Sequence, residues 1–169
     1  MAAWVVLTLL LSGNLSAGQP AFNHVRSEEE RVRHLVETGY RRSATFRALV
    51  DSVEASPCIV YIVRTVHMAQ GINGALVHVA AGGREQPILR VLVRPNVSDD
   101  EAIATIGHEL RHVIEAVNGD GGPGVDFTVF DRLDAAPGTT SGGRKYETGA
   151  AIIVTGVIRK ELRLSRQQR

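Results

Sequence analysis

Residues 98–119 read SDDEAIATIGHELRHVIEAVNG, and this stretch predicts a well-defined helix. Ser98 and Glu101 have the spacing of a capping box, and the residues between them are acidic, as is typical of a first helical turn. Asn118 and Gly119 are residues that commonly end helices. We therefore expect a helix that opens after Ser98 and runs to Val117.

The two sides of this predicted helix differ in chemistry. With 100° per residue and His108 at zero, His112 falls at about 40° and Glu115 at about −20°. A stripe of apolar residues lies on the opposite side, between about 140° and 240°. Its members are Ile103, Ile106, Leu110, Val113, Ile114 and Val117. The histidines therefore lie opposite the core-facing stripe, a placement that suits a metal site and also suits a solvated polar face.

The run His108-Glu109-Leu110-Arg111-His112 favours a metal site over a solvated face. Histidines at positions i and i+4 of one helix can both reach a single tetrahedral zinc ion. Glu109 points about 100° to the side, where its carboxylate can meet a zinc-activated water instead of the metal. We therefore predict that His108 and His112 bind Zn²⁺ and that Glu109 acts as a general base.

Along the chain, the remaining pattern predicts helices before and after the strands of a small sheet. Apolar residues at helical spacing predict helices over residues 27–38 and 41–55, with a capping box at Ser27 and an interruption at Gly39. Apolar, β-branched runs predict strands at 58–66, 74–80 and 87–95, the last two as a hairpin. A long loop over about 119–143 then leads to a last helix from about Lys145 to Leu164. The fold class is α+β, with a mixed or antiparallel sheet of three or four strands.

This chain resembles the zincin metallopeptidases, which carry H-E-x-x-H on a helix beneath a small sheet. The specific resemblance covers residues 108–112, and the wider order of elements covers about 57–165. Metzincins continue the motif with Gly and His at the positions that Glu115 and Asn118 occupy here, so the chain is not of that kind. The resemblance implies a zincin-like fold in which zinc has three protein ligands and one position open for water.

The third zinc ligand has several candidates in the sequence. Glu147 is the main one: the resemblance to gluzincins implies a glutamate from a helix after the motif helix, and small residues follow it at 149–151. An acidic residue at a helix start also simply complements the helix dipole. Glu115 extends the histidine row and also suits an ion pair with Arg111. The loop aspartates are further alternatives: Asp120, Asp126, Asp131 and Asp134.

The N-terminus and the composition indicate one exported domain. Residues 2–11 are apolar and are followed by small polar residues, which predicts a signal peptide over 1–18 and a single domain over 19–169. The segment carries no Lys or Arg, and the alternative is a buried N-terminal helix. We expect a secreted or periplasmic protein without stable membrane insertion after cleavage. The net charge of +1 gives no case for a nucleic-acid partner. The single cysteine, Cys58, is expected to be a buried packing residue.

The function that these predictions favour is a zinc peptidase acting on a peptide or protein substrate. Zinc would be held by His108, His112 and Glu147, while Glu109 would take a proton from water and pass it to the leaving amine. One alternative is a zincin-like module that binds zinc or a partner without catalysis. Another is an α+β domain in which the motif is accidental.

Overall fold

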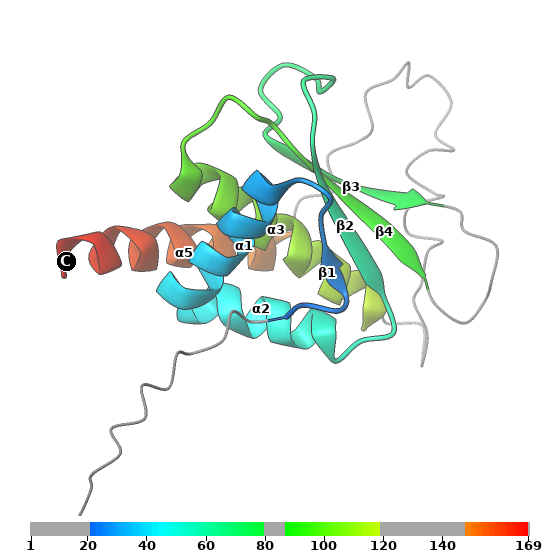
Figure 1. Ribbon diagram of the computed structural model, residues 1–169, viewed down its shortest axis with the longest axis horizontal. Helices are drawn as coiled ribbons and strands as arrows, with labels where there is room; N and C mark the ends of the chain where they lie inside the picture. The colour runs from blue at the N-terminus through cyan, green and yellow to red at the C-terminus, as the bar shows by residue number, and fades with distance from the viewer. Residues whose placement is uncertain (1–20, 80–86, 119–147, 169) are drawn as a thin grey trace, which may run out of the picture.

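The computed structural model describes residues 21–79, 87–118 and 148–168, which form an α+β fold with a helical layer on one side of a small mixed sheet (Figure 1). The predicted fold class is confirmed at this level. The elements in chain order are β1 (Val25–Arg26), α1 (Glu30–Arg42), α2 (Ala44–Glu54), β2 (Ile59–Arg64), β3 (Gly74–Val79), β4 (Ile88–Val93), α3 (Asp99–Val117) and α5 (Gly149–Gln167).

The sheet has four strands in the order β1-β2-β4-β3. The predicted hairpin is confirmed, since β3 pairs antiparallel with β4. β4 pairs parallel with β2, and β2 pairs parallel with β1. One face of the sheet packs on the helices. Successive side chains of a strand point to opposite faces, so alternate residues of β2 and β4 are buried. These residues are Val60 and Ile62 of β2 and Leu89, Val91 and Val93 of β4.

The first helices differ from the prediction at their boundaries. The capping box at Ser27 was wrong: α1 begins at Glu30 with Glu29 as its N-cap, and the Ser27 hydroxyl donates to the Ile62 carbonyl of β2 instead. The interruption falls at Ser43, not at Gly39, because the Ser43 hydroxyl accepts from the Phe46 N–H and caps α2. Gly39 is buried inside α1, where an added Cβ would lie 2.7 Å from Ile103 of α3. The glycine therefore permits close packing and does not end the helix.

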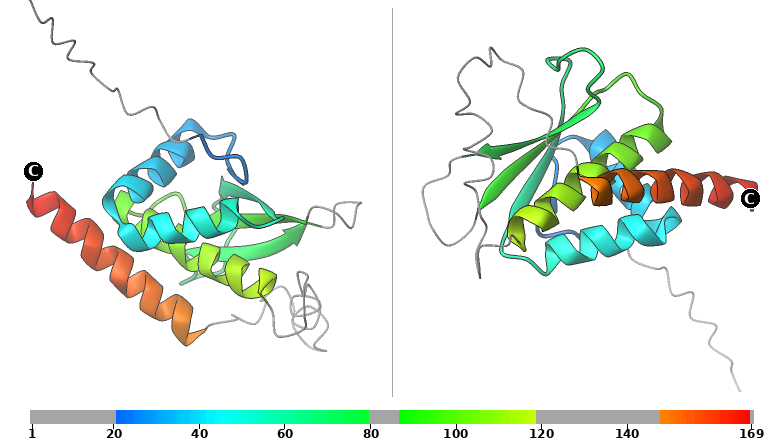
Figure 2. Two further views of the ribbon diagram at one scale, coloured as in Figure 1. Left: turned by 90° about the horizontal axis from the view of Figure 1, so that it is seen from below. Right: turned by 180° about the vertical axis from the view of Figure 1, so that it is seen from behind.

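The α3 helix lies at the centre of the molecule and follows its prediction closely. Its N-cap, Ser98, accepts a hydrogen bond from the Glu101 N–H, and its C-cap is Asn118. It contacts α1, α2, α5, β3 and β4, so it is buried on nearly every side (Figure 2). α5 begins at Gly149 with Thr148 as its N-cap, four residues later than predicted, and extends to Gln167.

The core confirms the expectation for the single cysteine. Cys58 is fully buried at the start of β2, and burial raises the pKa of its thiol to about 11. A thiol of this kind is held in the uncharged form at neutral pH and acts as a small apolar residue. Among the described residues, no helix combines the length and the apolar character that crossing a membrane requires.

Candidate metal centre

The H-E-x-x-H residues lie in the buried middle of α3. Glu109 is 6% exposed and His112 is 5% exposed, while His108 is half-buried. Both histidines were expected opposite the core stripe, and that geometry holds. The side opposite the stripe is not solvated, however, because α5 and β3 pack against it. A solvated polar face therefore does not describe His112 and Glu109.

The two imidazoles point at each other through their Nε2 atoms, which lie 3.1 Å apart. The rings are nearly perpendicular, with an interplanar angle of 80°. Two nitrogens bound to one tetrahedral zinc at about 2.0–2.1 Å would lie about 3.3 Å apart. The separation of the two Nε2 atoms therefore fits neighbouring ligands of one ion.

Each imidazole also has a partner at its other nitrogen, Nδ1. His108 Nδ1 lies 2.9 Å from the Thr155 hydroxyl of α5. That hydroxyl donates its own proton to the Ala151 carbonyl at 2.8 Å, so it accepts from His108 Nδ1–H. His112 Nδ1 lies 2.9 Å from the Glu115 carboxylate, which accepts only, when ionised. For a neutral imidazole, each of these contacts favours the tautomer that carries its proton on Nδ1 and leaves the Nε2 lone pair available to a metal.

Glu115 is a shared hydrogen-bond acceptor for three neighbouring side chains. Its carboxylate accepts from Arg111 Nε at 3.1 Å, as the predicted ion pair requires, and from the Thr148 hydroxyl at 2.9 Å. Burial by itself raises the pKa of Glu115, but the hydrogen bonds from His112, Thr148 and Arg111 outweigh it and lower this pKa below 4.5. Glu115 is therefore an ionised group that orients His112.

Glu109 faces the first residue of β3. A Cβ added to Gly74 would lie 2.6 Å from Glu109 Oε1 and 2.4 Å from Thr105 Cγ2. The absence of a side chain at Gly74 thus lets the strand approach the carboxylate closely. This contact places Glu109 beside β3, the strand at one end of the sheet order.

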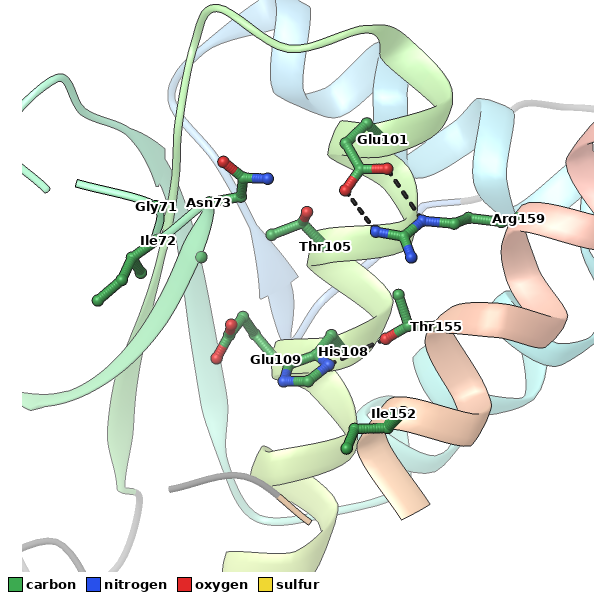
Figure 3. Close-up of a pocket in the computed structure, with 11 residues that line it drawn as sticks. Gly71, Ile72, Asn73, Glu101, Thr105, His108, Glu109, Ile152, Thr155 and Arg159 are labelled. Atoms are coloured by element: carbon green, nitrogen blue, oxygen red, sulfur yellow. Dashed lines mark hydrogen bonds and ion pairs between the residues drawn. The ribbon is translucent and has the colours of Figure 1, made fainter. Parts of the chain in front are cut away.

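A pocket of about 240 Å³ opens beside these residues, with α3 as its floor, α5 as one wall and residues 71–74 as the other. Figure 3 shows His108 and Glu109 at one end, Glu101 and Arg159 at the other, and Thr105 between them. The wall at 71–74 is braced by Arg94, whose guanidinium donates to the carbonyls of Ile72 and Ala69. The volume holds a side chain or several waters, since one water takes about 30 Å³ in the liquid.

The predicted third ligand, Glu147, lies outside the described residues, as do Asp120, Asp126, Asp131 and Asp134. Within the ranges that the structure describes, no group of three His, Cys, Asp or Glu side chains is arranged to hold a metal. The first described residue after Glu147 is Thr148, and its hydroxyl contacts Glu115, which in turn contacts His112. The chain therefore enters α5 two hydrogen bonds away from a predicted zinc ligand.

Sequence reasoning missed Thr155, Thr148 and Gly74. Thr155 is a lone polar residue in the apolar start of α5, and its buried position is the signal that such a residue has a partner. Thr148 stands three residues before Ala151, whose N–H it caps, a spacing typical of a helix start. Gly74 opens a strand, where a glycine often marks the close approach of another segment.

Comparison with known proteins adds no relative: no family model, curated protein or solved structure matches this chain.

Proposed function

We propose that this protein is a zinc-dependent peptidase with a zincin-like fold. The observation that carries the proposal is the pair of Nε2 atoms 3.1 Å apart, with both Nδ1 atoms engaged by acceptors. Two facing Nε2 lone pairs repel each other, and either a proton shared between the two nitrogens or a metal cation removes that repulsion. A zinc ion removes that repulsion and uses both lone pairs.

The zinc site that we propose consists of His108, His112 and Glu147. When bound, zinc lowers the pKa of a coordinated water to about 7 and polarises the carbonyl of a scissile peptide bond. The described part of the chain supplies the two histidines, and Glu147 is one residue before Thr148 in sequence. Glu115 and Thr155 would fix the orientation of the two imidazole rings, as hydrogen-bond partners of metal-bound histidines do in other proteins.

Glu109 is the proposed general base and then general acid. Its carboxylate would take a proton at Oε and deliver it to the leaving amine. The pocket beside it gives a substrate access, because Glu109 and His108 both line that pocket. An extended peptide could add to the outer edge of β3, which among the described strands pairs with β4 alone and where Gly74 leaves the backbone next to Glu109. The expected secreted or periplasmic location belongs to the same proposal.

The test compares the wild-type protein with three variants in zinc content and in cleavage of a broad peptide library. We expect about one zinc per chain in the wild type and in Glu109→Gln, with peptidase activity lost only in the latter. Glu147→Ala should lose most of its zinc. Glu30→Gln, a matched change on the exposed surface of α1, should keep both zinc and activity.

The outcomes separate the proposal from its alternatives. Zinc bound without cleavage by the wild type would favour a non-catalytic zinc-binding module. Zinc retained by Glu147→Ala would move the third ligand to another acidic residue. Absence of zinc from the wild type after zinc has been offered would overturn the peptidase proposal and leave the motif accidental.

A further inference from the structure

The α5 helix has a buried side and an exposed apolar side. Its buried side consists of Ala151, Thr155, Ile158 and Leu162, which pack toward α3 and its neighbours. On the outside, Ile153 is 67% exposed, Val157 is 38% exposed and Leu164 is 46% exposed. The left view of Figure 2 shows α5, coloured orange to red, along one edge of the molecule with the other helices on one side of it. Exposed large apolar residues that gather on one helix side indicate a contact surface.

These residues form one stripe with a basic side chain in its middle. Positions 153, 157, 160 and 164 fall within about 60° of helix circumference, and Lys160 lies between Val157 and Leu164 along the helix axis. Arg163 is exposed beside the stripe. Neither Lys160 nor Arg163 has a hydrogen bond or ion pair within the described part of the chain. We call the set Ile153, Val157, Lys160, Arg163 and Leu164 the outer face of α5.

Within the described ranges, no acidic side chain pairs with the basic residues of the outer face. Glu161 is the one acidic residue of α5, and its carboxylate accepts hydrogen bonds from Ser43 and Thr45 at the start of α2. The other basic residues of the helix, Arg159 and Arg166, pair with acidic residues of α3. The outer face is therefore apolar and cationic, a combination that fits an anionic lipid surface.

We infer that the outer face of α5 docks on an anionic membrane surface. Ile153, Val157 and Leu164 would enter the boundary between head groups and acyl chains. Lys160 and Arg163 would extend their long side chains to anionic head groups. A second copy of the chain fits this face less well, because an antiparallel pairing of two α5 helices through the stripe brings Lys160 close to Lys160 of the other copy.

The same helix connects this face to the pocket. Ile152, Thr155 and Arg159 line the pocket, and Ile152 is also 56% exposed next to the outer face. Docking of α5 would therefore hold the pocket beside the lipid surface. In terms of the proposed function, on which this step rests, the substrates would be peptide segments at a membrane surface.

The test uses an environment-sensitive fluorophore on Val157→Cys in the full chain, since the native Cys58 is buried. With vesicles of phosphatidylcholine and phosphatidylglycerol, we expect a blue shift and a severalfold rise in emission. Vesicles of phosphatidylcholine alone should give little change. The same label on Arg90→Cys, exposed on β4, is the control and should not respond. The fluorophore reports the environment of position 157, so a membrane contact that residues 2–11 make without α5 gives no signal.

A charge reversal tests the cationic part of the inference. Lys160→Glu combined with Arg163→Glu should weaken the response of the label to anionic vesicles roughly tenfold or more, because each basic residue near such a surface adds to binding. Arg90→Glu is the matched control and should have little effect. The double variant should lose the response to vesicles and keep its zinc content. A failure of the membrane inference can therefore be told apart from a failure of the proposed zinc site.

Three results would overturn the inference. One is an unchanged emission from position 157 with anionic vesicles. A second is an equal response to neutral and anionic vesicles. The third is a response without vesicles. If it appears with rising protein concentration, the face contacts a second copy of the chain. If it appears with a poly-glutamate peptide, the face contacts an acidic partner.

Discussion

Thr155 is the residue that joins α5 to the first histidine of the motif. Thr155→Val keeps the shape of the side chain but removes the acceptor for His108 Nδ1–H. Loss of such a partner typically lowers metal affinity 10–100-fold, and we expect about tenfold here. The measurement is a zinc titration against a chelating dye. Thr155→Ser retains the hydroxyl and should recover most of the affinity, whereas equal affinities in the Val variant and the wild type would contradict the role.

Gly74 is the residue whose lack of a side chain determines the contact between β3 and α3. Gly74→Ala would place a Cβ 2.4 Å from Thr105 Cγ2, and a β-branched side chain in a helix has little freedom to move aside. We expect a loss of about 1–3 kcal/mol in the free energy of unfolding, measured with urea. Gly156→Ala is the control, because nothing lies within 4 Å of its added Cβ. That variant should be slightly stabilised, since alanine is preferred inside a helix.

At this scale, the sequence predicted what depends on local spacing and missed what depends on tertiary contact. The helical period alone brings His108 and His112 to one side of α3, and the structure agrees. Thr155 lies 47 residues beyond His108, so no local pattern connects the two. Glu115 was weighed as a ligand or an ion-pair partner of Arg111. Its contact with His112 is not among those predictions, although residues three apart on a helix are neighbours.

At the scale of elements, the starts of the helices also show that local spacing is predictable from the sequence and that tertiary contacts are not. Both Ser27 and Ser98 precede acidic residues at capping-box spacing, yet only Ser98 caps a helix. The difference is the Ile62 carbonyl of β2, which takes the Ser27 hydroxyl proton while Ser27 accepts from the Glu29 N–H. The strand β1 was not predicted, because two residues are too few for a periodic pattern. It is held by the Glu54 carboxylate, which accepts from the N–H groups of Asn23, His24 and Val25.

The contact between α1 and β2 should depend on pH through Glu29. Burial by itself raises the pKa of Glu29, but the Arg64 backbone N–H and guanidinium outweigh it and hold this pKa below 4.5. A carboxyl whose folded pKa is depressed stabilises the fold above its unfolded pKa and loses that contribution as the pH falls toward the folded pKa. The stability advantage of the wild type over Glu29→Gln should therefore be complete at pH 7 and smaller at pH 4. Urea unfolding at both values measures it.

Glu28→Gln is the control for this pH dependence, because Glu28 is exposed one position earlier. Its difference from the wild type should be small at both pH values. An advantage over Glu29→Gln that is the same at pH 4 as at pH 7 would mean that the Glu29–Arg64 contact does not depend on the charge of the carboxyl.

Across the whole molecule, the chain order of elements was predictable but the strand order was not. The hairpin of β3 and β4 follows from the short connection between two alternating strands, and the structure contains it. The parallel pairing of β2 with β4 places β3 at the edge, and it depends on how the helices pack. In this arrangement the first residue of β3 lies beside Glu109 and lines the pocket, which is the position that the proposed function requires.

Zinc binding should stabilise the whole domain and not only the site. The two histidines connect α3 to α5 through Thr155 and through Glu115 with Thr148, so the site cannot open without separating the two helices. A ligand at 100 times its Kd adds about 2.7 kcal/mol. For a chain of this size, each kcal/mol raises Tm by about 2–4 °C, which predicts a rise of about 5–10 °C. Thermal unfolding with and without zinc measures it.

Variants of single histidines show whether this stabilisation comes from the proposed site. His112→Ala should remove the zinc-dependent rise in Tm, since it removes one of the two converging Nε2 atoms. His67→Ala changes an exposed histidine outside the site and should leave the rise intact. Glu109→Gln should also keep it, because the proposed role of this carboxylate is proton transfer and not metal binding. A rise of the same size in His112→Ala would mean that zinc stabilises the protein elsewhere, and the metal centre on α3 would have to be abandoned.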